Sequence, residues 1–194
     1  MGNVVCTEPS FESEGGKSIV TAQNNDVLIY PHVDTCMTIT LFLGNGDVMG
    51  GHASMIDMEL MEQLGAIDAT AALNKFCSGM KSAVSGTKIN KVVFVGGNMK
   101  KKTEAASHYS TRQAHAVFGP NSDQSTPGFA LVNTINCNSG IDVFFNLATN
   151  KLTVQKTDPS IPRGKLDAPV LRSNPFFEKV FSQLVGKFMP TNVD

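Results

Sequence analysis

The chain has 194 residues, of which 41% are hydrophobic, and its 16 Lys and Arg residues against 17 Asp and Glu residues leave a formal net charge of −1. This length predicts a single domain, and the hydrophobic share is large enough for a core that needs neither disulfides nor a metal ion. The balanced charge lacks the basic excess that nucleic-acid binding requires, and no apolar run reaches the roughly 20 residues of a transmembrane helix. We expect a monomeric cytoplasmic protein that binds no nucleic acid and does not insert stably into a membrane.

The four cysteines are far apart in the sequence, and no two of them have C-x-x-C spacing. They are Cys6, Cys36, Cys77 and Cys137. No secretory signal is recognisable, so we expect a reducing compartment in which these thiols are free. A free thiol is either buried and inert or placed to react.

The first part of the chain predicts an irregular lead-in and then strands. Residues 1–16 are polar and rich in glycine, and short apolar runs follow them. Residues 36–43 are apolar and β-branched, and they end at Gly44-Asn45-Gly46-Asp47, which is a strong hairpin signal. The return strand is predicted over residues 48–55, antiparallel to the first.

The middle of the chain predicts a helix and a buried strand. One apolar stripe recurs at helical spacing and consists of Leu73, Phe76, Cys77, Met80 and Val84. Gly86 stands where this helix would end, and the stripe predicts that Cys77 is a core residue. Residues 92–95 are continuously apolar and suit a buried strand, and a further helix is predicted around residues 110–118.

The last third predicts a hairpin, a crossover and a helix. Residues 141–145 and 152–154 are strand-like and flank a turn, and the proline-rich residues 158–172 predict an extended crossover. Asn174 stands at an N-cap position with Pro175 in the first turn, so a helix with an apolar face is predicted to follow them.

These elements together predict one α+β domain of mostly antiparallel sheet with packed helices. We expect the domain to span residues 17–158. The lead-in at residues 1–16 precedes it, and a C-terminal extension at residues 159–194, with one helix packed on the domain, follows it.

Cys36 and His52 form the candidate site, because a cysteine nucleophile needs a base within hydrogen-bond reach. In a hairpin that turns at residues 44–47, positions 36 and 52 lie near the same end of adjacent strands, and both side chains can point to one face. Four cysteines and four histidines offer sixteen pairs, so this pairing depends on its context.

Four segments in order supply that context. Residues 26–36 read DVLIYPHVDTC, an apolar strand, a loop and a cysteine, and residues 50–55 read GGHASM. Residues 94–99 read FVGGNM, and residues 143–156 read VFFNLATNKLTVQK. In this order and spacing the segments resemble the chemoreceptor glutamine deamidases, the CheD family, over roughly residues 18–156.

The resemblance implies a three-layer sandwich whose cysteine attacks the side-chain amide of a protein glutamine, without a metal or another cofactor. Cys36 would be the nucleophile and His52 the base, with Thr35, Gly51 and Gly97 near the substrate. Ammonia leaves, and water converts the thioester to glutamate. The cytotoxic necrotizing factor toxins use the same cysteine and histidine chemistry, so the resemblance points to a chemistry more than to a target.

The chain also departs from the family. The family places a threonine six residues before the cysteine, where it helps to position the histidine, and this chain has Tyr30 there. Tyr30 is therefore the candidate third member of the site. His32 is a second candidate partner of Cys36, and Asp34 is an alternative carboxylate to orient His52.

Three functions remain open at this point. The first is a receptor deamidase whose partner is a protein with an exposed glutamine, such as a chemoreceptor helix. The second is a delivered effector or toxin with the same chemistry on a host protein, which the altered loop, the C-terminal extension and Met1-Gly2 favour. The third is a non-catalytic binding module that retains the fold. Transglutamination and ester hydrolysis are open alternatives to deamidation, since the same thioester serves them.

Overall fold

The computed structural model describes most of the predicted strands and one long helix. The described residues are 2–10, 17–34, 36–54, 63–65, 69–96, 117–118, 129–135, 140–158, 160, 175, 177–184 and 189–192. Two predictions lie wholly or largely outside them, the helix at residues 110–118 and the crossover at residues 158–172.

The strands form two sheets. The first sheet has the order β1-β3-β8-β9-β10, with β1 at Val4–Cys6, β3 at Val27–Val33, β8 at Ile141–Asn146, β9 at Lys151–Lys156 and β10 at Phe177–Val180. The second sheet has the order β11-β7-β6-β4-β5-β2, with β11 at Met189–Asn192, β7 at Phe129–Ile135, β6 at Ile89–Gly96, β4 at Cys36–Leu43, β5 at Val48–Ser54 and β2 at Ile19–Ala22.

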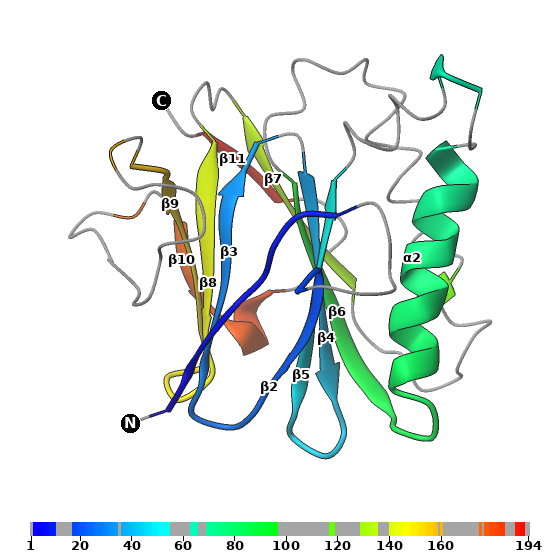
Figure 1. The fold of residues 1–194 in the computed structure, drawn as a ribbon. Helices are drawn as coiled ribbons and strands as arrows, with labels where there is room; N and C mark the ends of the chain where they lie inside the picture. The colour runs from blue at the N-terminus through cyan, green and yellow to red at the C-terminus, as the bar shows by residue number, and fades with distance from the viewer. Residues whose placement is uncertain are drawn as a thin grey trace.

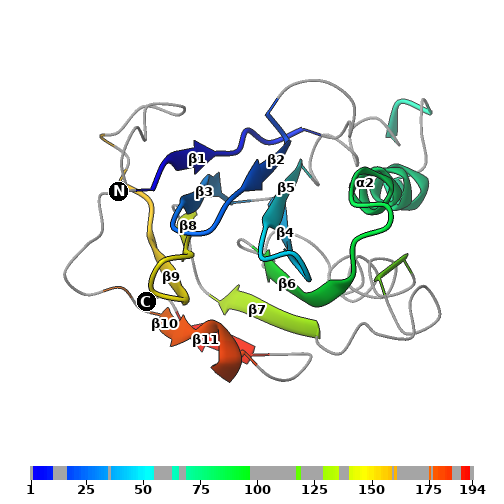
Figure 2. The same cartoon turned by 90° about the horizontal axis from the view of Figure 1, so that it is seen from below.

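The sheets and one helix stack as three layers. Helix α2 at Ala69–Ala83 lies on the outer side of the second sheet, and the first sheet lies on its other side (Figures 1 and 2). Most strand pairs are antiparallel, and the parallel pairs are β1 with β3, β6 with β7 and β7 with β11. The expected α+β fold with mostly antiparallel sheet is confirmed.

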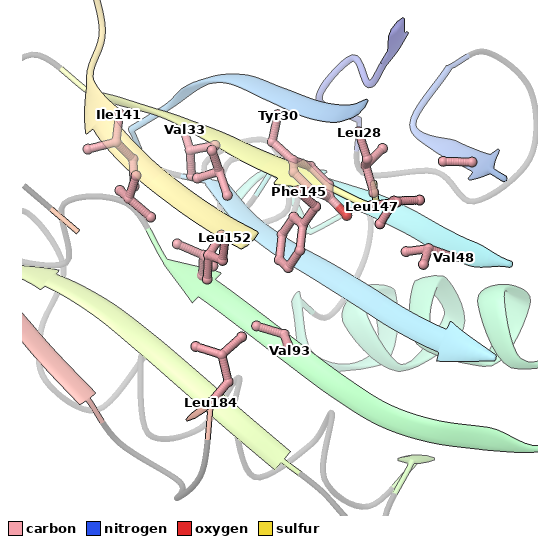
Figure 3. Packing of buried hydrophobic residues seen from close by; sticks show 14 of the residues in the cluster. Leu28, Tyr30, Val33, Val48, Val93, Ile141, Phe145, Leu147, Leu152 and Leu184 are labelled. Atoms are coloured by element: carbon pink, nitrogen blue, oxygen red, sulfur yellow. The ribbon is translucent and has the colours of Figure 1, made fainter. Parts of the chain in front are cut away.

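The central strand β4 divides the interior into two cores, because successive side chains of a strand point to opposite faces. Met37, Ile39 and Leu41 pack against α2, whereas Cys36 belongs to the core between the sheets. Tyr30, Phe145, Leu152 and Val93 fill the core between the sheets (Figure 3), and their clustering shows that both inner faces bury apolar side chains.

The predicted β4–β5 hairpin and helix α2 are confirmed. β4 and β5 pair antiparallel from Cys36↔Ser54 to Phe42↔Val48, around the Gly-Asn-Gly-Asp turn. The predicted apolar stripe is buried along its whole length, at Leu73, Phe76, Cys77 and Met80 of α2 and at Val84 directly after it. Cys77 is a core residue, as the periodicity predicts. β6, β8 and β9 also match the strands predicted from the sequence.

The C-terminal helix prediction is wrong. Residues 177–180 form β10, which pairs antiparallel with β9, and residues 181–183 form a short 3₁₀ turn. Phe177 and Phe181 nevertheless both pack on the core between the sheets, so the apolar spacing that suggested a helix is satisfied by a strand and a turn. The free edge of β9 decides this outcome, because it offers ladder hydrogen bonds that no helix could use. With β11 beside β7, the extension adds a strand to each sheet.

The lead-in is also more regular than the sequence predicts. Val4–Cys6 forms β1, which runs parallel to β3, and Ser10 makes an isolated bridge to Ala53 of β5. Short edge strands of this kind carry too few residues for a periodic pattern, so sequence composition alone indicates a loop. Within the described residues, no helix is long and apolar enough to cross a membrane.

Two adjacent glycines of β5 allow close packing on both faces of the second sheet. A Cβ at Gly50 would lie 2.6 Å from the Tyr30 hydroxyl oxygen, and a Cβ at Gly51 would overlap the Met80 sulfur and lie 2.9 Å from Phe76 Cε1. Gly51 therefore lets α2 approach the sheet.

We predict that Gly51→Ala lowers the free energy of unfolding by about 1–3 kcal/mol, the usual cost of overpacking a core. The measurement is urea denaturation, with Ser78→Ala on the exposed face of α2 as the control expected to change little. In a double-mutant cycle, Met80→Ala should make room for the added methyl group. Strict additivity of the two substitutions would contradict the proposed overlap.

Candidate functional site

Cys36 and His52 lie on one face of the β4–β5 hairpin. The register pairs Cys36 with Ser54 and Thr38 with His52, so the two candidate residues are diagonal neighbours whose side chains share a face. That face is the inner one, toward the first sheet, because Cys36 belongs to the core between the sheets. Cys36 starts β4, at the end of the sandwich opposite the hairpin turn (Figure 1).

The two side chains differ in their access to solvent. His52 is completely buried, and Cys36 retains 8% of its exposure. Of the two residues, Cys36 is therefore the one that solvent touches.

The His52 backbone is held from both sides. Its N–H donates to the Ser18 carbonyl oxygen at 2.9 Å, and its carbonyl oxygen accepts from the Ser10 N–H at 3.1 Å. The Ser54 N–H also donates to the Ser10 carbonyl oxygen. Ser10 is therefore hydrogen-bonded to β5 on both sides of Ala53. These bonds leave the side-chain torsions as the main freedom of His52.

The imidazole is bonded to a residue that the sequence analysis did not single out. His52 Nδ1 lies 3.1 Å from Thr7 Oγ1, and that hydroxyl also bonds to the Ile29 carbonyl oxygen at 3.1 Å. A hydroxyl has one proton, and a carbonyl oxygen can only accept. When Thr7 donates to Ile29, it accepts from Nδ1–H, and the lone pair of the neutral ring is then on Nε2. Thr7 is 45 residues from His52 in the sequence, in a segment without any motif, so no sequence signal connects the two.

Tyr30 lies beside His52, but its hydroxyl is directed elsewhere. The two rings are in edge contact with centroids 6.0 Å apart. The Tyr30 hydroxyl lies 2.7 Å from Thr40 Oγ1 and donates to the Ile39 carbonyl oxygen at 3.2 Å. The long ring carries the hydroxyl past His52 to β4, so Tyr30 packs against the imidazole instead of bonding to it. Burial raises the pKa of Tyr30 well above its usual range, which keeps the phenol neutral.

Gly51, the one predicted substrate contact among the described residues, does not share the face of Cys36 and His52. Gly51 faces α2, on the opposite side of the sheet from Cys36, and its missing side chain is explained by the packing of Met80 and Phe76. The expectation that Gly51 makes room for a substrate is therefore replaced by a packing role. Thr35 and Gly97 lie outside the described residues.

His32 and Asp34 are near the start of β4 in the sequence, on the irregular end of β3. The register of β3 with β8 shifts between Tyr30 and Val33, and His32 has a φ of 52°. The His32 N–H donates to Asp142 Oδ1 at 2.9 Å. Asp34 Oδ1 is buried and makes no hydrogen bond in the described part of the chain, so this oxygen does not hold the imidazole of His52.

Of the remaining cysteines, Cys77 is buried on the face of α2 that packs on the second sheet, and Cys6 is half-buried in β1. Cys137 lies outside the described residues. Among the residues that the structure describes, no group of three or more His, Cys, Asp or Glu side chains could hold a metal ion.

No protein-family model matches the chain, and no curated protein matches its sequence significantly.

Cys77 gives a prediction for the pH dependence of stability. Burial raises the pKa of Cys77 from 9.0 to about 12, because desolvation disfavours the thiolate. The unfolded chain then loses this proton first, so the stabilisation is complete below about pH 9 and is lost as the pH rises toward 12. We predict that the free energy of unfolding falls less steeply from about pH 9 to 11 in Cys77→Ala than in the wild type, by up to about 1.4 kcal/mol per pH unit. Parallel curves would contradict a protonated core thiol.

Proposed function

We propose that this protein is a cysteine-dependent deamidase that converts a glutamine side chain of a protein substrate to glutamate. The observation that carries the proposal is the shared inner face of Cys36 and His52 at one end of the β4–β5 hairpin. The resemblance of four sequence segments to the chemoreceptor glutamine deamidases supports the same chemistry. Resemblance to a family does not by itself establish an activity. The geometry of Cys36 and His52 is therefore the stronger of the two supports.

The first half of the reaction would form a thioester. His52 takes the proton of the Cys36 thiol through Nε2, and the thiolate attacks the carbonyl carbon of the glutamine amide. A backbone N–H at the start of β4 would stabilise the negative oxygen of the tetrahedral intermediate. As the C–N bond breaks, the imidazolium returns its proton to the leaving nitrogen, and ammonia departs.

The second half would consume water. Neutral His52 removes a proton from a water molecule, whose oxygen attacks the thioester carbonyl. The C–S bond breaks, the sulfur recovers its proton, and glutamate leaves. Thiol and imidazole then return to their starting protonation states, so no cofactor is needed.

The burial of the pair favours a side-chain amide over a peptide bond as the substrate. Cys36 is only 8% exposed and His52 is not exposed at all, so the reacting carbonyl has to arrive on a narrow and flexible chain. A glutamine side chain presents its amide on two methylene groups and meets this requirement. A peptide bond is flanked by backbone and side chains on both sides and is much wider.

We predict that the protein releases ammonia from glutamine-containing fragments of chemoreceptor helices, and that the fragments gain the mass of a glutamine-to-glutamate conversion. Cys36→Ala should abolish the reaction, and His52→Gln should reduce it by roughly 10²–10⁴-fold, the usual contribution of a general base. Cys77→Ala is the matched control, because Cys77 lies in the core between α2 and the second sheet, on the other side of that sheet from the proposed pair. Unchanged ammonia release by Cys36→Ala would refute the mechanism.

A second prediction concerns the thiols themselves and needs no substrate. Iodoacetamide should label Cys36 before Cys77 at neutral pH, because a thiolate paired with an imidazole reacts and a neutral buried thiol does not. His52→Gln should slow the labelling of Cys36 and leave that of Cys6 unchanged. Peptide mass spectrometry resolves the four cysteines, and equal labelling of Cys36 in both proteins would rule out activation by His52.

A non-catalytic binding module is the second candidate function. The complete burial of His52 favours it, because an imidazole bonded to a core hydroxyl is also an ordinary structural histidine. Under this alternative, Cys36→Ala would bind the glutamine-containing protein as the wild type does, and neither would release ammonia.

A further inference from the structure

The chain segment before β2 joins the two sheets beside the candidate site. We call residues 2–10 the N-terminal strap. The strap begins against the first sheet, where β1 pairs with β3, and ends against the second sheet, where Ser10 bridges to Ala53 (Figure 2). It is anchored at its start as well, since the Asn3 N–H donates to Asp26 Oδ1 and the Val27 N–H donates to the Asn3 carbonyl oxygen.

Thr7 sits in the middle of this strap and bonds to both sheets. Its N–H and its hydroxyl both lie within hydrogen-bond distance of the Ile29 carbonyl oxygen of β3, at 3.0 Å and 3.1 Å. The same hydroxyl lies 3.1 Å from Nδ1 of His52 on β5. Thr7 is completely buried, so water does not compete for these bonds.

We propose that Thr7 is a positioning residue for His52, which keeps the proton on Nδ1 and holds the ring so that Nε2 is the basic nitrogen of the site. This inference rests on the proposed function and adds that the N-terminal strap is part of the working site. The hydroxyl that orients the histidine comes from the residue directly after β1 and not from the segment that leads into Cys36.

The hydrogen bonds favour Thr7 over the other two candidates for this role. Tyr30 touches the imidazole by its ring, and its hydroxyl is engaged with Thr40 and Ile39. Oδ1 of Asp34 makes no hydrogen bond in the described part of the chain. The hydrogen bond that the structure shows at Nδ1 of the imidazole is made by Thr7.

A single hydrogen bond with Thr7 is sufficient to orient the ring because the His52 backbone is already fixed. Ser10 and Ser18 fix the His52 backbone through its carbonyl oxygen and its N–H. With the backbone fixed, the ring needs a single further bond to select its orientation and its tautomer, because the hydrogen bond at one ring nitrogen decides which nitrogen carries the proton.

The test compares three full-length variants with the wild type. Thr7→Val has nearly the same shape but lacks the hydroxyl, and Thr7→Ser restores the hydroxyl. Thr157→Val is the matched control, because Thr157 is also buried and donates one hydrogen bond, to Asp142, without contacting His52. Urea denaturation of each variant separates a general loss of stability from an effect on the site.

Two readouts report on His52 without any substrate. The ring ¹⁵N shifts should show the Nδ1–H tautomer in the wild type, in Thr7→Ser and in Thr157→Val, and a loss of that preference in Thr7→Val. The pH profile of Cys36 alkylation should shift in Thr7→Val alone, with the rate near neutral pH lowered at least about tenfold. This is less than the roughly 10²–10⁴-fold contribution of a general base, because the imidazole itself remains.

The outcomes separate this inference from the proposed function. Either of two results would overturn the role of Thr7. One is an Nε2–H tautomer in the wild type, which can be measured without any variant. The other is a Thr7→Val protein that has the same tautomer and the same alkylation profile as Thr157→Val. If the tautomer and the alkylation profile respond to Thr7 as expected but no protein releases ammonia, the positioning role stands and the deamidase function falls.

Discussion

The pairing of β4 with β5 is the constraint on which the rest of the structure depends. β4 is central in the second sheet, and its alternation sends Met37, Ile39 and Leu41 toward α2 and Cys36 toward the first sheet. The pairing with β5 then brings His52 to the face of Cys36. A shift of this register by one residue would turn His52 toward the helix and empty the candidate site.

The inner face of this hairpin is unusually polar for the middle of a sandwich. Thr38 and Thr40 alternate with the apolar residues of β4, and each has a hydrogen-bond partner, the Val95 carbonyl oxygen for Thr38 and the Tyr30 hydroxyl for Thr40. Buried polar groups are costly unless they are bonded, so these bonds make a polar strip tolerable inside the core. The proposed site is the end of this strip, where Cys36 retains some exposure.

The same packing that builds the hairpin also excludes some residues from the chemistry. Gly51 serves the contact with α2, and the hydroxyl of Tyr30 serves the contact with β4. Thr7 of the N-terminal strap makes the hydrogen bond to the imidazole that the family resemblance led us to expect from Tyr30. Thr7 reaches it because the strap crosses from one sheet to the other at the level of His52.

Periodicity and turn chemistry in the sequence were sufficient to predict the β4–β5 hairpin, α2 with Cys77 in the core, and the strands β6, β8 and β9. Each of these depends on interactions between near neighbours, which leave a pattern in the chain. They also placed Cys36 and His52 near one end of one hairpin. The tertiary structure alone decided that residues 177–180 form a strand, because the free edge of β9 outweighs a local helix signal. It alone brought Thr7 to His52, because a single hydrogen bond across 45 residues has no local pattern that a sequence could display.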